Sequence, residues 1–366
     1  MEEISLKKRI RGWMAFDWAT QPFYTLGLTF IFGPYFAGVS FEYFSTIYAD
    51  AETAKATSQA TWFWGQTIAG LLIALTAPLI GAYADSTGRR MPWIWMFAML
   101  YLPFTWALWY TDPSGGNIYF ILLCFNLAFI AAEFMLIFVN AILPSLGSKK
   151  EVGKISGDGA AIGYWGGVLG LFVMLILFVN KGDGTTIAGL APAFGLDPEK
   201  GEDFRAVGPF IAIWFAVFMI PFFAWVREPR TANRQGGVSQ AMADLKKSLH
   251  GAWHRKSLLN FLIGSMFYRD ALNALYAGGG VYARLVLGWE IMQILVFGIV
   301  GAITAAVATQ IGGYFDKRLG PKPVIHVCCY ILILVCLIIV GINRESFFGL
   351  VAIADGSRAP DIVFYI

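Results

Sequence analysis

Ionisable side chains interrupt the long apolar stretches of this sequence at only a few positions. These positions are Asp17, Glu133, Arg269 and Asp270. A charge is costly inside a membrane, so such residues usually pair, line a water-filled cavity or contact ions and substrates. Burial in a medium of low dielectric favours the neutral carboxyl group, which lets an acid take up and release a proton near neutral pH. These residues indicate the coupled movement of a proton and a polar solute.

Polar side chains share a helix face with each of these charges. Asn126, Glu133 and Asn140 follow one another at seven-residue steps, which return to one helix face with little drift. Lipid cannot solvate such a stripe, so each stripe must face protein or water. All of these residues are candidates for contact with a substrate or a coupling proton. Two further stripes follow the three- and four-residue steps of a helix: Asp17, Gln21 and Tyr24, and Arg269, Asp270 and Asn273.

The same charges allow a purely structural interpretation. Glu133 and Arg269 stand near the middle of their apolar stretches, and a helix rises about 1.5 Å per residue, so both are expected at a similar depth. An ion pair between them could simply hold two helices together. A buried acid that always stays neutral would serve the same purpose, and the residues alone leave these alternatives open.

Composition decides the class of protein. Apolar residues make up 57% of the chain and charged residues 14%, against about 45–50% and about 25% in soluble domains. A helix needs about 20 apolar residues to cross a bilayer. We therefore predict an all-α membrane protein. Its nine spans are expected near 13–38, 60–83, 92–110, 118–143, 158–179, 207–226, 258–283, 290–313 and 323–342, and a tenth apolar run begins at Ile362.

Glycines recur at four-residue steps in the fifth of these spans. Gly163 and Gly167 form one such pair, and Gly166 and Gly170 form another. Small residues at this spacing allow helices in a membrane to approach closely, so we expect this span to pack tightly on a neighbour. The loop over 180–206 that follows is rich in glycine and proline, and we expect it to be irregular.

Most lysines and arginines fall in the loops of one side, which predicts a cytoplasmic N-terminus. The longest loop on that side follows the sixth span and includes a basic segment around Lys246 and Lys247 that we expect to form a surface helix. We therefore predict an N-terminal six-helix half over 1–226, a central cytoplasmic loop over 227–257 and an incomplete C-terminal half over 258–366. A multi-pass protein of a bacterial inner membrane fits this pattern.

A short charged loop recurs between apolar stretches. Gly312 and Asp316 follow Gly81 and Asp85 at one and the same offset, which predicts two similar halves. Charges at helix ends can lock or release neighbouring helix termini. The residues of this predicted gating motif are Gly81, Asp85, Gly88, Arg89 and Arg90 in the first copy, and Gly312, Asp316 and Gly320 in the second.

The loop from Gly81 to Arg90 resembles the signature between helices two and three of the major facilitator superfamily. This resemblance implies two pseudo-symmetric six-helix halves, with helices one, four, seven and ten around a central cavity. It also implies that the motif acts in gating and not in substrate binding. The superfamily has twelve spans, so we expect a chain truncated within its second half.

Further stretches resemble the vacuole-effluxer-like branch of that superfamily, also called the unknown major facilitator family, whose fungal member is an autophagy-related exporter of amino acids. Thr20, Arg269 and Ala271 depart from the pattern of that family, and Arg269 adds a positive charge beside Asp270. The stretches that resemble the family are Phe16-Asp17-Trp18-Ala19, Asn140-Ala141-Ile142-Leu143-Pro144, Ile155-Ser156-Gly157 with Gly163-Tyr164-Trp165-Gly166-Gly167, and Tyr268-Arg269-Asp270-Ala271 with Asn273.

These observations predict a secondary transporter that works by alternating access and moves a small solute, with protons as the coupling ion and an amino acid as the favoured substrate. One alternative is efflux of amphipathic compounds, which the many aromatic residues favour. Another is a membrane receptor or scaffold that transports nothing. We expect no enzyme activity, no cofactor, no metal site and no nucleic-acid partner, because no catalytic, metal-ligand or phosphate-binding pattern is present. We expect a monomer in the bilayer.

Overall fold

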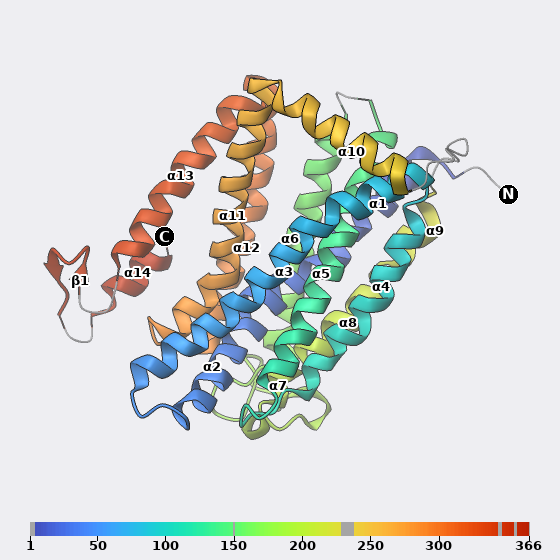
Figure 1. Cartoon of the computed structure of the whole chain (residues 1–366). Coiled ribbons are helices and arrows are strands. Elements are labelled where there is room, and N and C mark those ends of the chain that lie inside the picture. Colours follow the sequence, from blue (N-terminus) through green and yellow to red (C-terminus); the bar gives the residue numbers. More distant parts are fainter. Residues whose placement is uncertain (1–3, 149–150, 228–237, 343–345, 355–356, 366) are drawn as a thin grey trace.

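The computed structural model describes residues 4–148, 151–227, 238–342, 346–354 and 357–365. Long helices run side by side through the molecule (Figure 1). Eight helical segments of the described residues are long and apolar enough to cross a membrane. This confirms the predicted all-α membrane protein. We call the end that carries the N-terminus and α10 (Val238–Trp253) the N-terminal face, and the end that carries α7 (Glu202–Arg205) the opposite face (Figure 1).

The first span is one path made of three helical pieces. It consists of α1 (Leu6–Pro22), the π-helix η1 (Phe23–Phe30) and α2 (Phe32–Ser45). The break follows Pro22, which has no N–H to continue the α-helical ladder. In the π-helical part the backbone bonds reach five residues back, as Ile31 N–H does to the carbonyl of Leu26 at 3.0 Å. The predicted span 13–38 is correct in place and too short at both ends.

The next five predicted spans are also present, and most helices extend beyond the predicted apolar stretches. They are α3 (Ala51–Thr87), α4 (Met91–Trp106) with η2 (Ala107–Tyr110), α5 (Ile118–Ile142) with η3 (Leu143–Ser145), α6 (Val152–Leu177), and α8 (Val207–Phe218) with α9 (Ile220–Trp225).

Four long helices follow the sixth span in the described part of the chain: α10, α11 (Lys256–Leu285), α12 (Ile291–Leu319) and α13 (Pro321–Gly341). The helix α10 confirms the predicted surface helix and packs against α3, while residues 228–237 of the predicted central loop lie outside the described residues. The helix α11 is long enough to span a bilayer but is not one of the eight apolar segments, since it carries Arg269, Asp270 and other polar residues. It packs against α2 and η1, and α12 packs against α6.

Short elements cover the opposite face. The predicted irregular loop 180–206 contains only η4 (Ala193–Gly195), η5 (Pro198–Lys200) and α7. A small antiparallel hairpin, β1 (Ser346–Phe347) and β2 (Val351–Ala352), was not predicted. The predicted start of a tenth span is the short helix α14 (Ala359–Tyr365), and Asp361 of this helix accepts a hydrogen bond from Trp289 Nε1 at 2.6 Å.

The first span lies at the centre of the packed core and is the most buried of the eight segments, whereas α13 has no buried residue. Phe125 of α5 joins the first, second and fourth spans: its ring stacks on Phe23 at 5.3 Å and on Phe32 at 5.8 Å, and meets Trp62 of α3 at 4.9 Å between ring centroids. Such ring pairs stabilise a core beyond the surface they bury. The core therefore holds η1 and α2 against α3 and α5.

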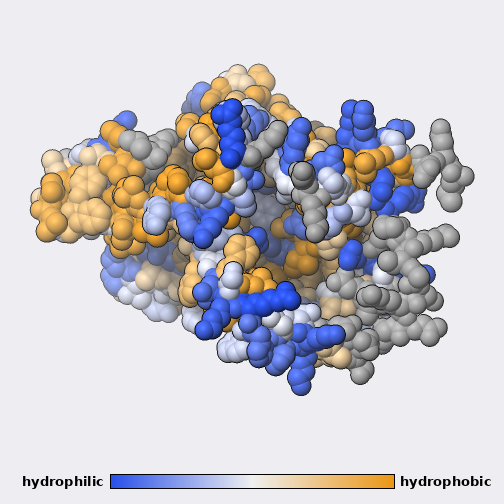
Figure 2. Space-filling view, turned by 90° about the horizontal axis from the view of Figure 1, so that it is seen from above, coloured by the Kyte–Doolittle hydropathy of each residue, from blue (hydrophilic) through white to orange (hydrophobic). Residues whose placement is uncertain are grey.

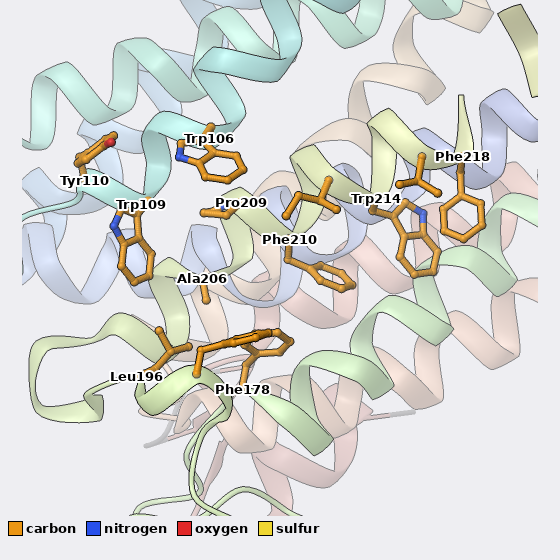
Figure 3. Close-up of a pocket in the computed structure, with 13 residues that line it drawn as sticks. Trp106, Trp109, Tyr110, Phe178, Leu196, Ala206, Pro209, Phe210, Trp214 and Phe218 are labelled. Atoms are coloured by element: carbon orange, nitrogen blue, oxygen red, sulfur yellow. The ribbon is translucent and has the colours of Figure 1, made fainter. Parts of the chain in front are cut away.

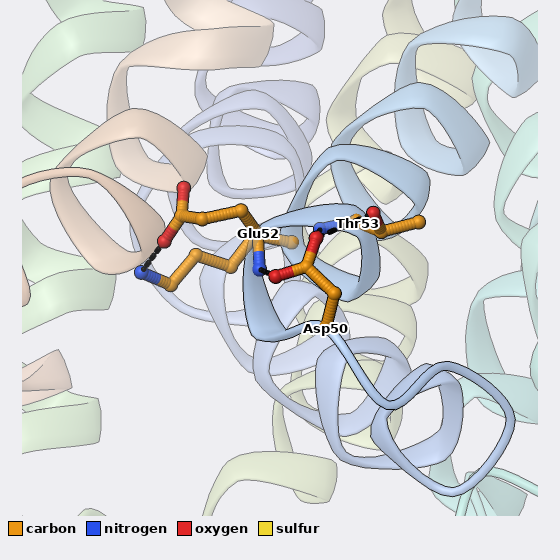
Figure 4. Close-up of polar contacts among 4 residues, drawn as sticks. Asp50, Glu52 and Thr53 are labelled. Atoms are coloured by element: carbon orange, nitrogen blue, oxygen red, sulfur yellow. Dashed lines mark hydrogen bonds and ion pairs between the residues drawn. The ribbon is translucent and has the colours of Figure 1, made fainter.

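The second span begins well before its apolar stretch because Asp50 caps it. Asp50 Oδ2 accepts hydrogen bonds from the Thr53 N–H at 2.9 Å and the Thr53 hydroxyl at 2.6 Å (Figure 4). Lys55 Nζ also pairs with Glu52 Oε1 at 2.9 Å on the first turns. The capping bonds satisfy helix N–H groups that have no partner within the helix. The Thr53 hydroxyl beside the carboxylate lowers the pKa of Asp50.

We expect Asp50→Ala to lower the melting temperature of the detergent-purified protein at pH 7, because the start of α3 loses its cap. The pKa of Asp50 is lower in the folded state, so its contribution is complete above the ordinary pKa of about 3.9 and disappears as pH falls below the folded value. The variant and the wild type should therefore converge in melting temperature under strongly acidic conditions. Glu42→Gln, on an exposed side chain of α2, is the control and should change little. A gap between Asp50→Ala and wild type that is constant with pH would contradict the assignment.

Candidate functional site

Pro22 interrupts the backbone hydrogen bonds of the first span, and a residue of the sixth span supplies the missing donor. Because Pro22 has no N–H, the carbonyl oxygen of Trp18 loses its usual partner within the helix. Trp214 Nε1 on α8 donates a hydrogen bond to that oxygen at 3.0 Å. The two indole rings also stack with their centroids 5.7 Å apart. The break in the first span is thus held in a fixed position by α8.

A stripe of glycines on α6 brings this helix into direct contact with the first span. A Cβ atom on Gly159 would lie 2.6 Å from Asp17 Oδ2, and one on Gly166 would lie 2.9 Å from the Trp18 carbonyl oxygen. Gly163 is similarly close to Asp17. The predicted close packing of these glycines on a neighbouring helix is confirmed, and the neighbour is α1. Small residues allow such close approach of helices in membranes.

The π-helix places one predicted residue against another. The hydroxyl of Tyr24 in η1 donates a hydrogen bond to Glu133 Oε1 on α5 at 2.9 Å. The Thr29 hydroxyl donates to the carbonyl of Tyr24 at 3.0 Å and thereby secures the π-helical turn. Both Tyr24 and Glu133 are half-buried. Two stripes that the sequence placed on different spans therefore meet at this hydrogen bond.

The remaining residues of these two stripes are not all part of one cluster. Gln21 Nε2 donates to the Thr25 hydroxyl at 3.3 Å, one turn along the same helix. Asn126 is buried, donates to the Leu122 carbonyl at 2.8 Å, and its Oδ1 has no partner among the described residues. Asn140 is exposed. The contact between spans one and four is therefore centred on Tyr24 and Glu133.

The third predicted stripe lies on α11, which packs against α2 and η1. Arg269, Asp270 and Asn273 are exposed side chains of α11. Among the described residues, no ion pair within 4.0 Å joins Glu133 to Arg269. The helix-holding ion pair that the sequence allowed is thus not formed in this structure.

Close contacts between the first span and the seventh and eighth spans lie towards the opposite face. A Cβ on Gly280 of α11 would collide with the carbonyl oxygen of Thr29, and one on Gly298 of α12 would lie 2.6 Å from the Phe30 ring. Arg284 Nε lies near Gly38 of α2. Viewed from the N-terminal face, the molecule is hollowed near its centre (Figure 2). The bundle is thus closed towards one end and open at the other.

The first copy of the predicted gating motif joins three spans at the N-terminal face. Gly88 follows the last turn of α3 with φ of 64°, a left-handed conformation that glycine adopts without strain. The chain then turns so that Arg90 Nη1 donates to the Ala141 carbonyl oxygen at the end of α5, at 3.1 Å. A cation suits the negative end of a helix dipole. Arg89 is exposed, Gly81 has open space at its Cβ position, and the side chain of Asp85 lies outside the described residues.

The second copy repeats the turn but not the arginine contact. Gly320, with φ of 81°, separates α12 from α13, and its N–H donates to the Asp316 carbonyl at 2.9 Å. The Asp316 side chain is exposed, and Gly312 has open space at its Cβ position. Nearby, the Arg318 guanidinium lies over the Tyr314 ring at 4.4 Å. The glycine at the helix end is the feature that both copies share.

Comparison with known proteins identifies the family. A profile described as vacuole effluxer Atg22 like matches residues 46–355. The chain belongs to this family. It is also 23% identical over 334 residues to an uncharacterized MFS-type transporter, YxiO, of Bacillus subtilis strain 168, and the match covers 90% of this chain and 72% of the relative. These findings confirm the predicted family and the all-α fold of a major facilitator. The Atg22-like chain is a multi-pass membrane transporter of a small solute.

The contact of Trp214 with the first span was not predicted from the sequence of this Atg22-like chain. Trp214 looks like any aromatic residue of an apolar stretch, and only the missing N–H of Pro22 hints that a donor is needed nearby.

We expect Trp214→Phe to lower the free energy of unfolding by about 1–3 kcal/mol, because the Trp18 carbonyl oxygen is left without a partner. In the background of Pro22→Ala, residue 22 gains an N–H that can bond to Trp18, so the same substitution should cost less. Denaturation with SDS measures the loss of unfolding free energy caused by Trp214→Phe in each of the two backgrounds. Trp253→Phe, on an exposed tryptophan of α10, is the control. Equal costs in both backgrounds would contradict the role of Trp214.

Substituting alanine for each of two glycines of α6 should change the free energy of unfolding in opposite directions. Glycine to alanine within a helix normally stabilises it by about 0.8–1.0 kcal/mol. Gly157 has no neighbour within 4 Å of a new Cβ, so Gly157→Ala should stabilise the protein. Gly166→Ala should destabilise it by about 1–3 kcal/mol, because its Cβ meets the backbone of Trp18. The same unfolding assay compares them, and a stabilising Gly166→Ala would show that α1 and α6 are not in close contact.

Proposed function

We propose that this Atg22-like transporter moves an amino acid or a similar small zwitterion by alternating access, with a proton as the coupling ion. The observation that carries the proposal is the hydrogen bond between Tyr24 and Glu133 at 2.9 Å. It joins a carboxyl group of span four to the π-helical part of span one. A proton on Glu133 would change the strength of this bond, since hydrogen bonds to charged groups are stronger than those between neutral groups. Protonation and the position of η1 would then be linked.

The other charged candidates suit a substrate that carries both signs of charge. Arg269 offers a guanidinium that can bind a carboxylate in two parallel hydrogen bonds, and Asp17 and Asp270 offer carboxylates for an ammonium group. Arg269 and Asp270 are exposed and have no ion-pair partner among the described residues. We propose that Gln21, Asn126, Asn140 and Asn273 supply further polar contacts as the helices move. Transporter substrates generally bind near the middle of the membrane between the repeats.

We infer that the structure represents the state open to the N-terminal face. The contacts of Gly280 with Thr29 and of Gly298 with Phe30 would form the closed gate on the opposite face. The reverse state would separate these helices and close the hollow of Figure 2. The gating motif would hold the ends of α3, α4 and α5 together at the N-terminal face, with Arg90 as the residue that anchors α5.

We propose that the N-terminal face is cytoplasmic, because the basic loops gather there, and that the protein resides in a bacterial inner membrane as a monomer. The relative in Bacillus subtilis is consistent with a bacterial setting. We further propose that residues 1–226 and 258–366 act as the two moving parts, joined through 227–257 and the contacts of α11 with the first span.

The test is uptake and counterflow of labelled amino acids in proteoliposomes, with and without a proton gradient. We expect Glu133→Gln to abolish gradient-driven uptake, because the neutral side chain cannot release a proton, while counterflow persists. Tyr24→Phe should keep transport but change its dependence on pH, because the partner of the carboxyl group is lost. Both variants must retain the melting profile of the wild type.

The control is Glu42→Gln, which removes an exposed carboxylate from α2 and should leave uptake unchanged. Uptake of no amino acid under any gradient would refute the proposed substrate class. Gradient-driven uptake that survives Glu133→Gln would refute the role of this acid. A loss of stability without any effect on flux would favour a receptor or scaffold.

A further inference from the structure

An aromatic cavity of about 670 Å³ lies beside the sixth span (Figure 3), and neither Tyr24 nor Glu133 lines it. This volume falls within the range of about 300–1,000 Å³ that is usual for sites of small organic ligands. Three groups of residues line it: Trp106, Trp109 and Tyr110 of η2 and the end of α4, Phe178, Phe194 and Leu196 around the end of α6, and Ala206, Pro209, Phe210, Ile213, Trp214, Val217 and Phe218 on or next to α8.

The cavity is a lengthwise trough along α8. Phe210, Trp214 and Phe218 follow one another at four-residue steps, and their rings are 5.6 and 4.6 Å apart. Eight residues of helix span about 12 Å along the axis. Behind this wall, the Trp18 ring packs 5.7 Å from both Trp214 and Phe218. A long, narrow and apolar space of this kind suits an extended chain better than a compact polar solute.

The trough opens sideways from the bundle. Ile213 is 54% exposed and Val217 51%, and both lie on a segment apolar enough to cross the membrane. Trp106 and Tyr110 on the other wall are exposed as well. Side chains that are exposed at this depth of a spanning segment face the acyl chains of the bilayer. Lipid is thus the medium that reaches the open side.

A cation stands at the outer end of the trough. The Arg205 guanidinium lies 5.0 Å from the centroid of the Trp109 ring, and its Nε donates to the Trp109 carbonyl at 2.7 Å. Its Nη1 donates to the Lys200 carbonyl at 3.3 Å, so the Nη2 donors have no partner among the described residues. The half-buried Asp112 follows Tyr110 in the same loop, and its Oδ1 accepts a hydrogen bond from the Ser114 N–H at 2.9 Å. Both signs of charge are therefore present where lipid headgroups lie.

We propose that this trough binds one acyl chain of a zwitterionic phospholipid from the leaflet of the opposite face. The acyl chain of the lipid runs along α8 from Phe210 towards Trp18, and the headgroup phosphate accepts hydrogen bonds from Arg205. The ammonium group of the headgroup lies on the side of Asp112. The bound chain supports Trp18, whose neighbour in sequence is Asp17, so the lipid stabilises the broken part of the first span.

The experiment uses the full chain in vesicles of phosphatidylethanolamine that carries a photoreactive diazirine in one acyl chain. After irradiation, mass spectrometry maps the adducts. We expect adducts on the segments 106–110 and 206–218. Ile213→Trp fills the trough and should lower these adducts about tenfold, which corresponds to about 1.4 kcal/mol of binding. The matched control is Ile68→Trp, on an α3 residue of equal exposure (55%) outside the cavity, and it should leave them unchanged.

A second arm tests the headgroup. Diazirine-labelled diacylglycerol lacks the phosphate, so in the wild type it should give fewer adducts than labelled phosphatidylethanolamine. In Arg205→Gln the two labelled lipids should give equal numbers of adducts. Adducts spread evenly over exposed residues of α3 and α8, or unchanged by Ile213→Trp, would refute the site. Displacement of the lipid by an amphipathic dye that is then transported would also refute it and would assign the trough to cargo. The readout is adduct formation and not flux, so it is independent of the proposed substrate.

Discussion

The carbonyl oxygen of Trp18 is the group on which the geometry of the site depends. Pro22 removes its partner within the helix, and an unsatisfied carbonyl in a bilayer costs several kcal/mol. Trp214 supplies the missing donor at 3.0 Å, and the chain beyond Pro22 continues as a π-helix. This wider helix places Tyr24 against Glu133 on α5. A regular α-helix through residues 23–30 would rotate Tyr24 to another direction, so the contact between spans one and four depends on the break.

Glycines determine how closely the other helices approach that span. The stripe from Gly159 to Gly170 on α6 leaves no room for a Cβ against Asp17, Trp18 and Thr25, and Gly280 of α11 is in the same position against Thr29. Without a strong hydrophobic force between helices in lipid, close van der Waals packing contributes much of the stability of such contacts. The two surfaces differ in location. The α6 stripe follows the length of α1 and η1, which suits a contact that stays fixed. The α11 contact lies only towards the opposite face, which suits a contact that separates when the helices move.

Much of this architecture could be predicted from the chain. The helices that form the spans were placed correctly because an apolar stretch of about 20 residues is the length that crosses a bilayer. Several helix ends were predicted within a few residues, but the start of α3 was placed nine residues too late, since capping by Asp50 extends this helix into polar sequence that hydropathy assigns to a loop. Helical periodicity also identified the stripes that include Asp17, Tyr24 and Glu133. It could not identify which stripes meet, because contact between spans depends on the rotation of each helix about its axis. Tyr24 bonds to Glu133, and among the described residues no ion pair within 4.0 Å joins Glu133 to Arg269.

Local composition and short motifs were enough to establish the class of protein, the order of the spans, the family and the identity of the charged residues. Helix packing alone established that Trp214 completes the ladder broken at Pro22, that Tyr24 and not Arg269 is the partner of Glu133, and that an aromatic trough lies along α8. The physical reason is that each of these features joins residues far apart in the chain. Their distances depend on how the helices pack, and no local pattern in the sequence encodes that packing.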